Sequence, residues 1–200
     1  MKMQAQTAKG ASGASARERL LNAANELFYE EGVHTVGIDR VIEKAGVAKA
    51  SLYSTFGSKE ALVQAYLAGK HESRKARVTR KIAAATTPRA RLLAVFDALE
   101  ERVSEPNFRG CAFVLATAEG RTGSGVRRVC DQSRAWMRDL LVELATAAGA
   151  ADPDRLAQQL LLVYDGATVG AHMDDDVAVV KTARSLAISL VDAALGKRDR

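Results

Sequence analysis

The chain has 200 residues, of which 48% are hydrophobic and 26% are charged, and its formal net charge is +5. This composition can bury a core, and the positive charge favours a polyanionic partner. Its two cysteines argue against a disulfide framework and fit a reducing cytosol, and no apolar run approaches the roughly 18 residues that cross a bilayer. We therefore expect a cytoplasmic protein without a membrane segment.

The chain begins with a polar segment and continues into a predicted helix. Residues 1–15 are rich in Gly, Ala, Ser, Thr and Gln and lack the apolar stretch of a signal peptide, so we expect a disordered tail. The first helix is predicted over about residues 16–31, with Leu20, Leu27 and Phe28 on its buried side.

Two short helices joined by a tight turn are predicted next. Ile38, Val41, Ile42 and Ala45 recur at the i, i+3, i+4, i+7 spacing of a helix with one buried face. Gly46 follows directly, where a residue with positive φ can end one helix and redirect the chain. This arrangement is typical of the helix-turn-helix unit, whose second helix enters the major groove of DNA.

The second helix of the pair has its own inward face, made of Val47, Leu52 and Phe56. Its outward side chains are hydroxyls, a phenol and a cation, which suit phosphates and base edges. The predicted DNA-facing residues are Lys49, Ser51, Tyr53, Ser54 and Thr55. We expect Lys49, Ser51 and Thr55 near bases or adjacent phosphates. Tyr53 and Lys59 are expected as phosphate clamps, with Thr35, Arg17 and Arg40 as further contacts to the DNA backbone.

The same residues carry a family resemblance. The run AGVAKASLYSTFGSKEAL and the preceding RERLLNAANELFYEEG resemble the TetR family of bacterial one-component regulators over about residues 16–66. Two positions depart from the pattern of that family. Gly37 and Ala48 stand where Thr or Ser often begins the second and third helices. Each departure removes a hydroxyl that could cap a helix, and a cap contributes about 1 kcal/mol.

The rest of the chain is also predicted to be helical. A fourth helix begins near Ser58, which can cap it, and becomes strongly basic toward Lys81. Further helices are expected from Pro88 to about Glu105, over 111–118, from about 126 to 148, from about 154 to 172 and from about 174 to 195. The fold class is therefore all-α, with about nine helices. By the resemblance, residues 16–66 form the DNA-binding domain and residues 67–200 an effector-binding and dimerisation domain.

The last two predicted helices have unusually wide apolar stripes. A helix buried on two sides in so small a domain needs extra cover, which a second copy of the chain supplies. The resemblance implies a homodimer through a four-helix bundle of these helices, reading a palindromic operator. The predicted interface residues are Leu160, Val163, Gly166, Ala167, Gly170, Ala187, Leu190 and Val191. The alternative is that these helices are covered within their own subunit.

The resemblance also implies an effector cavity among the middle helices. The candidate wall residues are bulky side chains on the inner stripes, and plain core packing is the alternative for each of them. They are Phe96, Leu99, Phe113, Trp136, Met137, Leu140 and Tyr164. Trp136 and Tyr164 are favoured because a buried indole N–H or phenol needs a polar partner, which a ligand can provide. Few ionisable groups fall on these stripes, so we expect a neutral, mostly apolar effector.

Three other functions are weighed against a DNA-binding regulator. Cys111 and Cys130 could form a redox switch, although buried cysteine usually serves as a small hydrophobe. The acids of residues 174–176 could bind a cation, although acids that open a helix also favour its dipole. No nucleophile elbow, phosphate loop or paired-His motif suggests an enzyme. We expect no cofactor and no metal.

The sequence as a whole indicates a transcriptional regulator. DNA binding and pairing are inferred from the residues, whereas repression and release by a small-molecule effector are implied by the resemblance. The rival interpretation is an interaction protein that keeps the fold and has lost specific DNA binding, which the departures at Gly37 and Ala48 leave open.

Overall fold

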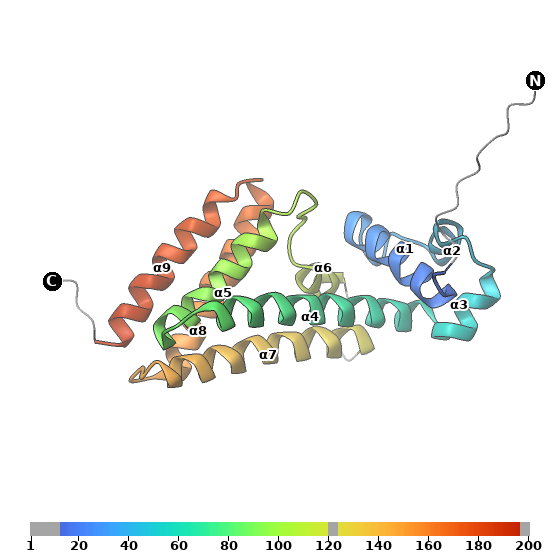
Figure 1. Cartoon of the computed structure of the whole chain (residues 1–200). Helices are drawn as coiled ribbons and strands as arrows, with labels where there is room; N and C mark the ends of the chain where they lie inside the picture. Colours follow the sequence, from blue (N-terminus) through green and yellow to red (C-terminus); the bar gives the residue numbers. More distant parts are fainter. Residues whose placement is uncertain (1–12, 120–123, 197–200) are drawn as a thin grey trace, which may run out of the picture. The chain divides into compact units, whose positions relative to one another are not determined.

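The computed structural model describes residues 13–119 and 124–196, in which it contains nine α-helices and no strand (Figure 1). The prediction of an all-α protein is confirmed. The helices are α1 (Ala16–Glu31), α2 (Ile38–Ala45), α3 (Lys49–Phe56), α4 (Lys59–Ala84), α5 (Pro88–Val103), α6 (Ala112–Glu119), α7 (Gly125–Ala147), α8 (Pro153–Met173) and α9 (Ala178–Ala194). None of the helices in the described part of the chain is long and apolar enough to cross a membrane.

The chain divides into two compact units, Met1–Tyr66 and Leu67–Arg200, called here the N-terminal and C-terminal units. The helix α4 is continuous, and its residues 59–66 belong to the N-terminal unit while residues 67–84 belong to the C-terminal unit. Residues 1–12 of the predicted tail lie outside the described residues. The tail prediction extended to Ser15, which instead has a defined structural role as the N-cap of α1.

The first helix begins at a complete capping box. The Glu18 backbone N–H donates to Ser15 Oγ at 3.2 Å, and the Ser15 N–H donates to Glu18 Oε2 at 2.7 Å. Each side chain therefore accepts a hydrogen bond from a backbone N–H that has no partner within the helix. The buried side of α1 includes Leu20 and Phe28, and the Phe28 ring meets the edge of Tyr66 at a centroid distance of 5.7 Å. This aromatic pair ties α1 to the beginning of α4 within the N-terminal unit.

The predicted helix-turn-helix is present as α2, a glycine turn and α3. Gly46 adopts φ 61°, a left-handed conformation that glycine takes without steric cost, and its N–H bonds the carbonyl of Glu43 at 3.1 Å. Val41 and Leu52 have no exposed surface, so the buried faces of the two helices meet as predicted. Neither α2 nor α3 has a side-chain cap, because Gly37 and Ala48 occupy the N-cap positions.

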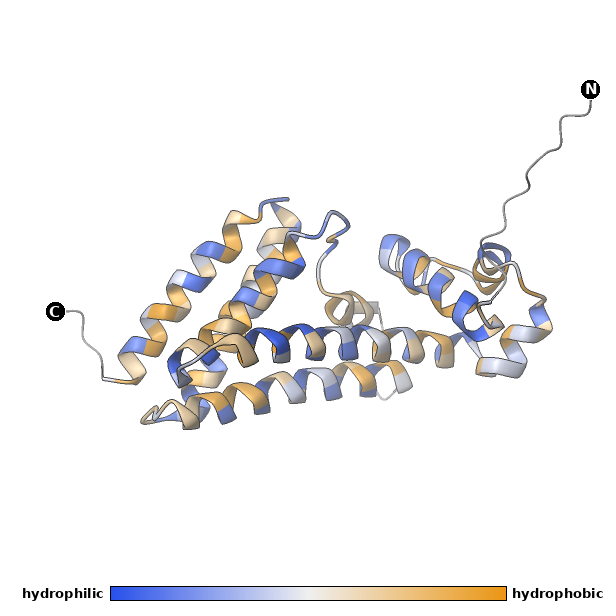
Figure 2. Cartoon of the chain, viewed as in Figure 1, coloured by the Kyte–Doolittle hydropathy of each residue, from blue (hydrophilic) through white to orange (hydrophobic). Residues whose placement is uncertain are grey.

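The C-terminal unit is built around α5, α7, α8 and α9. The helix α8 packs against α7 and α9, α5 packs against α9 and α7, and the short α6 packs on α7. Phe96, Met137 and Leu160 are among the fully buried side chains of this core. Figure 2 shows hydrophilic colour gathered along the later turns of α4, which carry the basic run predicted from the sequence.

Ion pairs connect helices of the C-terminal unit that are distant in sequence. Arg89 of α5 holds Asp192 of α9 in a two-pronged pair, with Nε–Oδ1 and Nη2–Oδ2 distances of 2.6 and 2.7 Å. Glu101 of α5 accepts from Lys81 of α4 at 2.8 Å and also pairs with Arg80. The pKa of the Glu101 carboxyl falls to about 2, first because of the hydrogen bond from Lys81 and then that from Arg80.

The start of the last helix differs from the prediction. The sequence suggested a helix from about residue 174, but Asp174 is the C-cap of α8 and α9 begins at Ala178. Asp175 lies at φ 50°, which breaks the helix, and Asp176 Oδ1 accepts from the Ala178 N–H at 2.8 Å. These acids therefore form the turn between two helices. Among the described residues, no group of three His, Cys, Asp or Glu side chains is placed to hold a metal ion.

Candidate nucleic-acid interface and internal cavity

The uncovered face of α3 carries the side chains that were predicted to meet DNA. Tyr53 is 47% exposed, and Lys49, Ser54 and Thr55 are exposed as well, while Ser51 is partly buried. Leu52, on the opposite side of this short helix, is fully buried and fixes the rotation of α3 about its axis. The face is therefore presented outward by the packing of the N-terminal unit.

Two hydroxyls on this face are engaged by the helix itself. Thr55 Oγ1 donates to the Ser51 carbonyl at 2.6 Å, and Ser54 Oγ donates to the same carbonyl at 3.2 Å. Such bonds orient the hydroxyl oxygens, whose lone pairs stay available to accept from a base amine or a bridging water.

Lysine side chains border the face, each with a partner in the N-terminal unit. Lys49 Nζ lies 2.9 Å from Asp39 Oδ1 of α2, and this hydrogen bond raises the pKa of Lys49. Lys59 Nζ donates to the His34 carbonyl at 3.4 Å, beside the exposed Thr35. Lys49, Lys59 and Thr35 thus come from the start of α3, the start of α4 and the loop before α2.

The two predicted arginine contacts lie in different settings. The Arg17 guanidinium sits over the Phe56 ring, 5.7 Å from its centroid, so it lies next to the end of α3. Arg40 is exposed and forms an ion pair with Glu31. A further arginine was missed by the sequence reasoning: Arg19 Nη1 donates to the carbonyl of Gly46 at 3.2 Å and so fastens the turn to α1. No local sequence signal marks this role, because the two residues meet only in the folded unit.

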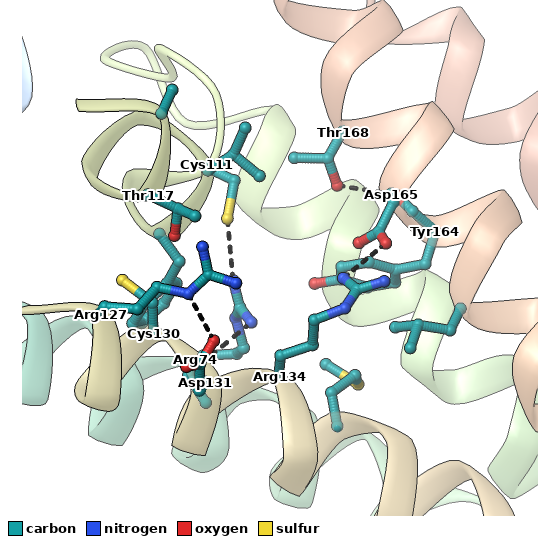
Figure 3. Close-up of a pocket in the computed structure, with 16 residues that line it drawn as sticks. Arg74, Cys111, Thr117, Arg127, Cys130, Asp131, Arg134, Tyr164, Asp165 and Thr168 are labelled. Carbon is teal, nitrogen blue, oxygen red and sulfur yellow. Dashed lines mark hydrogen bonds and ion pairs between the residues drawn. The ribbon is translucent and has the colours of Figure 1, made fainter. Parts of the chain in front are cut away.

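A cavity of about 440 Å³ lies within the C-terminal unit, among α4, α6, α7 and α8 (Figure 3). Three of the predicted wall residues, Phe113, Met137 and Tyr164, line it. The prediction was wrong for Phe96 and Leu99, which are 0% and 2% exposed and belong to the core behind the cavity.

Two other predicted wall residues also lie elsewhere. Trp136 packs its ring against His71, with centroids 5.4 Å apart, and Leu140 packs against the core. Neither residue lines the cavity. Helical periodicity marked all of these side chains as inward, but it does not distinguish a core face from a cavity wall.

The cavity wall is more polar than the sequence suggested. Arg127 pairs with Asp131 at 2.9 Å, and Arg134 pairs with Asp165 at 2.7 Å. Arg74 of α4 also lines the cavity and donates to Cys111 Sγ at 3.2 Å. The expectation of few ionisable groups is therefore wrong, because these long side chains reach the cavity from the flanks of their helices.

The two cysteines are free and both line this cavity. Cys111 accepts the hydrogen bond from Arg74, and Cys130 is 4% exposed. Burial raises the pKa of the Cys130 thiol, the direction that disfavours the reactive thiolate. This environment argues against Cys130 as the acidified partner of a redox switch.

The outer face of α8 and α9 carries most of the large apolar side chains that the described residues leave exposed. Leu162 is 74% exposed, Val169 42%, Met173 77% and Leu186 54%. Only Tyr53 and Val114 are in the same class elsewhere in the described residues. We call the four residues on α8 and α9 the outer apolar face.

The predicted interface set divides between this face and the core. Leu160, Ala167, Ala187 and Val191 are buried within the subunit, so their assignment to an interface was wrong. Val163, Gly166, Gly170 and Leu190 are exposed or only partly buried. Both sides of each helix are apolar, and the pattern alone does not tell which side the subunit covers itself.

The chain is similar to known proteins over most of its length. The family model described as "Bacterial regulatory proteins, tetR family" matches residues 20–66. SCO4454, a TetR-family transcriptional regulator from Streptomyces coelicolor, is 32% identical with a TM-score of 0.86, covering 90% of this chain and 96% of that one. A TetR-type regulator from Streptomyces avermitilis, sav143, is 36% identical with a TM-score of 0.77, covering 90% and 98%.

A curated relative gives the same result. The HTH-type transcriptional regulator YjdC of Escherichia coli is 29% identical over 175 residues, which cover 86% of this chain and 91% of YjdC. The helix-turn-helix geometry, the family model and likenesses over almost the full chain agree. The chain belongs to the TetR family of helix-turn-helix transcriptional regulators.

Proposed function

We propose that the protein is a homodimeric repressor that binds a palindromic operator through α3 of each subunit and leaves it when a small molecule enters the cavity. The observation that carries this proposal is the course of α4. Its first turns supply Leu62, Val63 and Tyr66 to the core of the N-terminal unit, and a later turn places Arg74 in the cavity wall. One continuous helix therefore belongs to both the DNA-reading and the cavity-bearing unit.

On the DNA side, the proposed base-edge or adjacent phosphate contacts are Lys49, Ser51 and Thr55. Tyr53, Ser54 and Lys59 contact phosphates, and Thr35, Arg17 and Arg40 contact the backbone farther out. The exposure of α3 beside two lysines supports this assignment, since phosphate contacts position a reading helix and side chains at base edges give it specificity.

Pairing is proposed through the outer apolar face. Exposed side chains such as Leu162 and Met173 are unfavourable in water, and a second copy of the same face buries them in a symmetric contact. The resulting four-helix arrangement includes Val163, Gly166, Gly170 and Leu190. Pairing also sets two reading helices about 34–36 Å apart, the spacing of successive major grooves on one side of the duplex.

Release follows from a two-state equilibrium. One state holds the two α3 helices at the operator spacing, and the other does not. A ligand shifts this equilibrium only if it binds the cavity of one state more tightly than that of the other. Movement of α4 is the proposed link between cavity and reading helix.

The test uses fluorescence anisotropy with duplexes tiled across the promoter region beside the protein's own gene. We expect one fragment to bind far more tightly than a scrambled duplex of equal length, and deletion of the gene to raise expression from that promoter. Lowered expression would make the protein an activator. Failure of every fragment to bind at low salt would favour the rival, an interaction protein that has lost specific DNA binding.

A further inference from the structure

The guanidinium groups around the cavity differ in their partners. Arg127 and Arg134 each pair with a carboxylate, Asp131 and Asp165 respectively. Arg74 does not: among the described side chains, no carboxylate lies within 4.0 Å of it. The cavity therefore has two charge-paired arginines and one whose described partners are all neutral.

The surroundings of Arg74 explain why this difference matters. Its Nη2 donates to Cys111 Sγ at 3.2 Å, its Nη1 lies 3.5 Å from Ser133 Oγ, and its guanidinium stacks 4.5 Å from the Phe113 ring centroid. An arginine cannot discard its proton, so the charge persists inside a partly apolar pocket. A thiol, a hydroxyl and a ring hold the group in place, but none of them neutralises it.

Tyr164 provides a second, independent observation. Its side chain lines the cavity and is 8% exposed, and the phenol makes no hydrogen bond to any described residue. The phenol oxygen is not among the fully buried polar atoms, so it is open to the cavity and available to a ligand there. Burial raises the pKa of Tyr164, so the phenol stays protonated at neutral pH and can donate. Arg74 and Tyr164 both line the cavity (Figure 3), and after burial the charge of Arg74 has the largest effect on the pKa of Tyr164.

We infer that the cavity binds a small monocarboxylate whose head group accepts from Arg74 and Tyr164 and whose apolar body lies along Phe113, Met137 and Leu161. This inference rests on the proposed function in taking the cavity for the effector site. A planar guanidinium matches a carboxylate in a two-pronged bond, and one uncompensated cation matches one negative charge. A doubly charged phosphate would leave a charge unmatched here, because the other two arginines already have carboxylates. The apolar wall residues favour an aryl or alkyl body.

The inference is tested with matched pairs of probes that differ only in charge. The probes are 3-phenylpropionate against 3-phenylpropanamide, and octanoate against octanamide, titrated by calorimetry at pH 7.5 into the full-length protein without DNA. We expect the carboxylate of at least one pair to bind at least tenfold more tightly than its amide. Arg74→Gln should remove this preference, and Tyr164→Phe should reduce it several-fold.

Two further variants serve as controls. Arg127→Gln removes a guanidinium that already has a carboxylate partner, so the preference for the acid should persist. Arg74→Lys keeps the charge without the planar fork and should retain part of the preference, which gives a readout even if Arg74→Gln fails to fold. Equal binding of acid and amide, no binding of either acid, or a full preference in a folded Arg74→Gln variant would overturn the inference.

The same probes separate this inference from the proposed function. If an acid binds through Arg74 but leaves operator affinity unchanged, the carboxylate site stands and effector release fails. If only the neutral amides bind and they release the operator, the carboxylate site is overturned while effector release stands.

Discussion

The two units of this protein present their functional side chains in opposite ways. In the N-terminal unit, the residues proposed to read bases lie in the short run from Lys49 to Thr55 on a single helix. In the C-terminal unit, the cavity takes Arg74 from α4, Phe113 from α6 and Tyr164 from α8. A surface of the first kind depends on the rotation of one helix, whereas a site of the second kind depends on how several helices assemble.

The largest expected effect comes from the outer apolar face of the C-terminal unit. Replacing both Leu162 and Leu186 by Arg places two like charges at the centre of the proposed symmetric contact. We expect a monomer by analytical ultracentrifugation, and a loss of operator affinity of more than about 100-fold because two linked reading helices become independent.

The control is Thr146→Arg, which adds one arginine at an exposed position on α7. This variant should sediment as a dimer and bind the operator with the same affinity as the natural protein. A double-Arg variant that still sediments as a dimer would assign pairing to another surface.

A smaller effect is expected from Lys59 at the edge of the DNA-facing surface. Lys59→Ala should remove one phosphate contact, which weakens operator and unrelated DNA by the same factor and lowers the slope of log K against log salt by about one unit. Anisotropy titrations at several salt concentrations measure both quantities. Lys44→Ala is the control: Lys44, in the last turn of α2, pairs with Glu26 of α1, and its loss should leave the slope unchanged. A change in the preferred sequence would contradict the role of Lys59 as a phosphate clamp.

The sequence predicts the helix-turn-helix better than the cavity, because the helix-turn-helix is formed by residues that are close together in the chain. Ile38 to Ala45, Gly46 and Leu52 lie close together in the chain, so their periodicity predicted the helix-turn-helix that the structure contains. For the all-α fold as a whole, helical spacing and the breaks before Pro88 and Pro153 were sufficient.

The cavity was harder to predict for a physical reason. Phe96 and Tyr164 lie on equally apolar stripes and their ring centroids are 6.2 Å apart, yet only Tyr164 lines the cavity. Arg74 stands in a basic run that usually marks a solvated face, and only the packing of α6 and α7 around it makes it part of a wall. Helical periodicity predicts that a side chain points inward, but it does not predict whether that side chain meets packed core or a cavity.

The helix caps give a third prediction, confined to the N-terminal unit. Ala48 precedes α3 with φ −70° and ψ 150°, close to the −62° and 159° of the Ser15 cap of α1. Ala48→Ser should therefore bond the free N–H groups of α3 without backbone change and raise the free energy of unfolding by about 1 kcal/mol. The equivalent change at Gly37 should add only a few tenths of a kcal/mol, because glycine is already a fair cap.

Urea unfolding followed by circular dichroism measures these differences. The control is Ala50→Ser, which makes the same chemical change two residues into α3, where it cannot cap and should be neutral or slightly destabilising. Equal effects at positions 48 and 50 would show that the hydroxyl acts by some means other than capping.

The charge cluster of the C-terminal unit is expected to contribute little to stability. Lys81 and then Arg80 lower the pKa of Glu101 to about 2, below its ordinary 4.5, so the ionised form stabilises the folded state. That contribution is fully present above about pH 4.5 and is lost as the pH falls toward about 2. Because Glu101 is partly exposed, water screens the pairs and the contribution is about 1 kcal/mol at most. The thermal midpoint of Glu101→Gln should lie below that of the natural protein at pH 6, and the gap should narrow as the pH approaches 3. A difference in thermal midpoint that does not change with pH would mean that Glu101 stabilises the protein through packing. The ion pairs between α4 and α5 would then make no net contribution to stability.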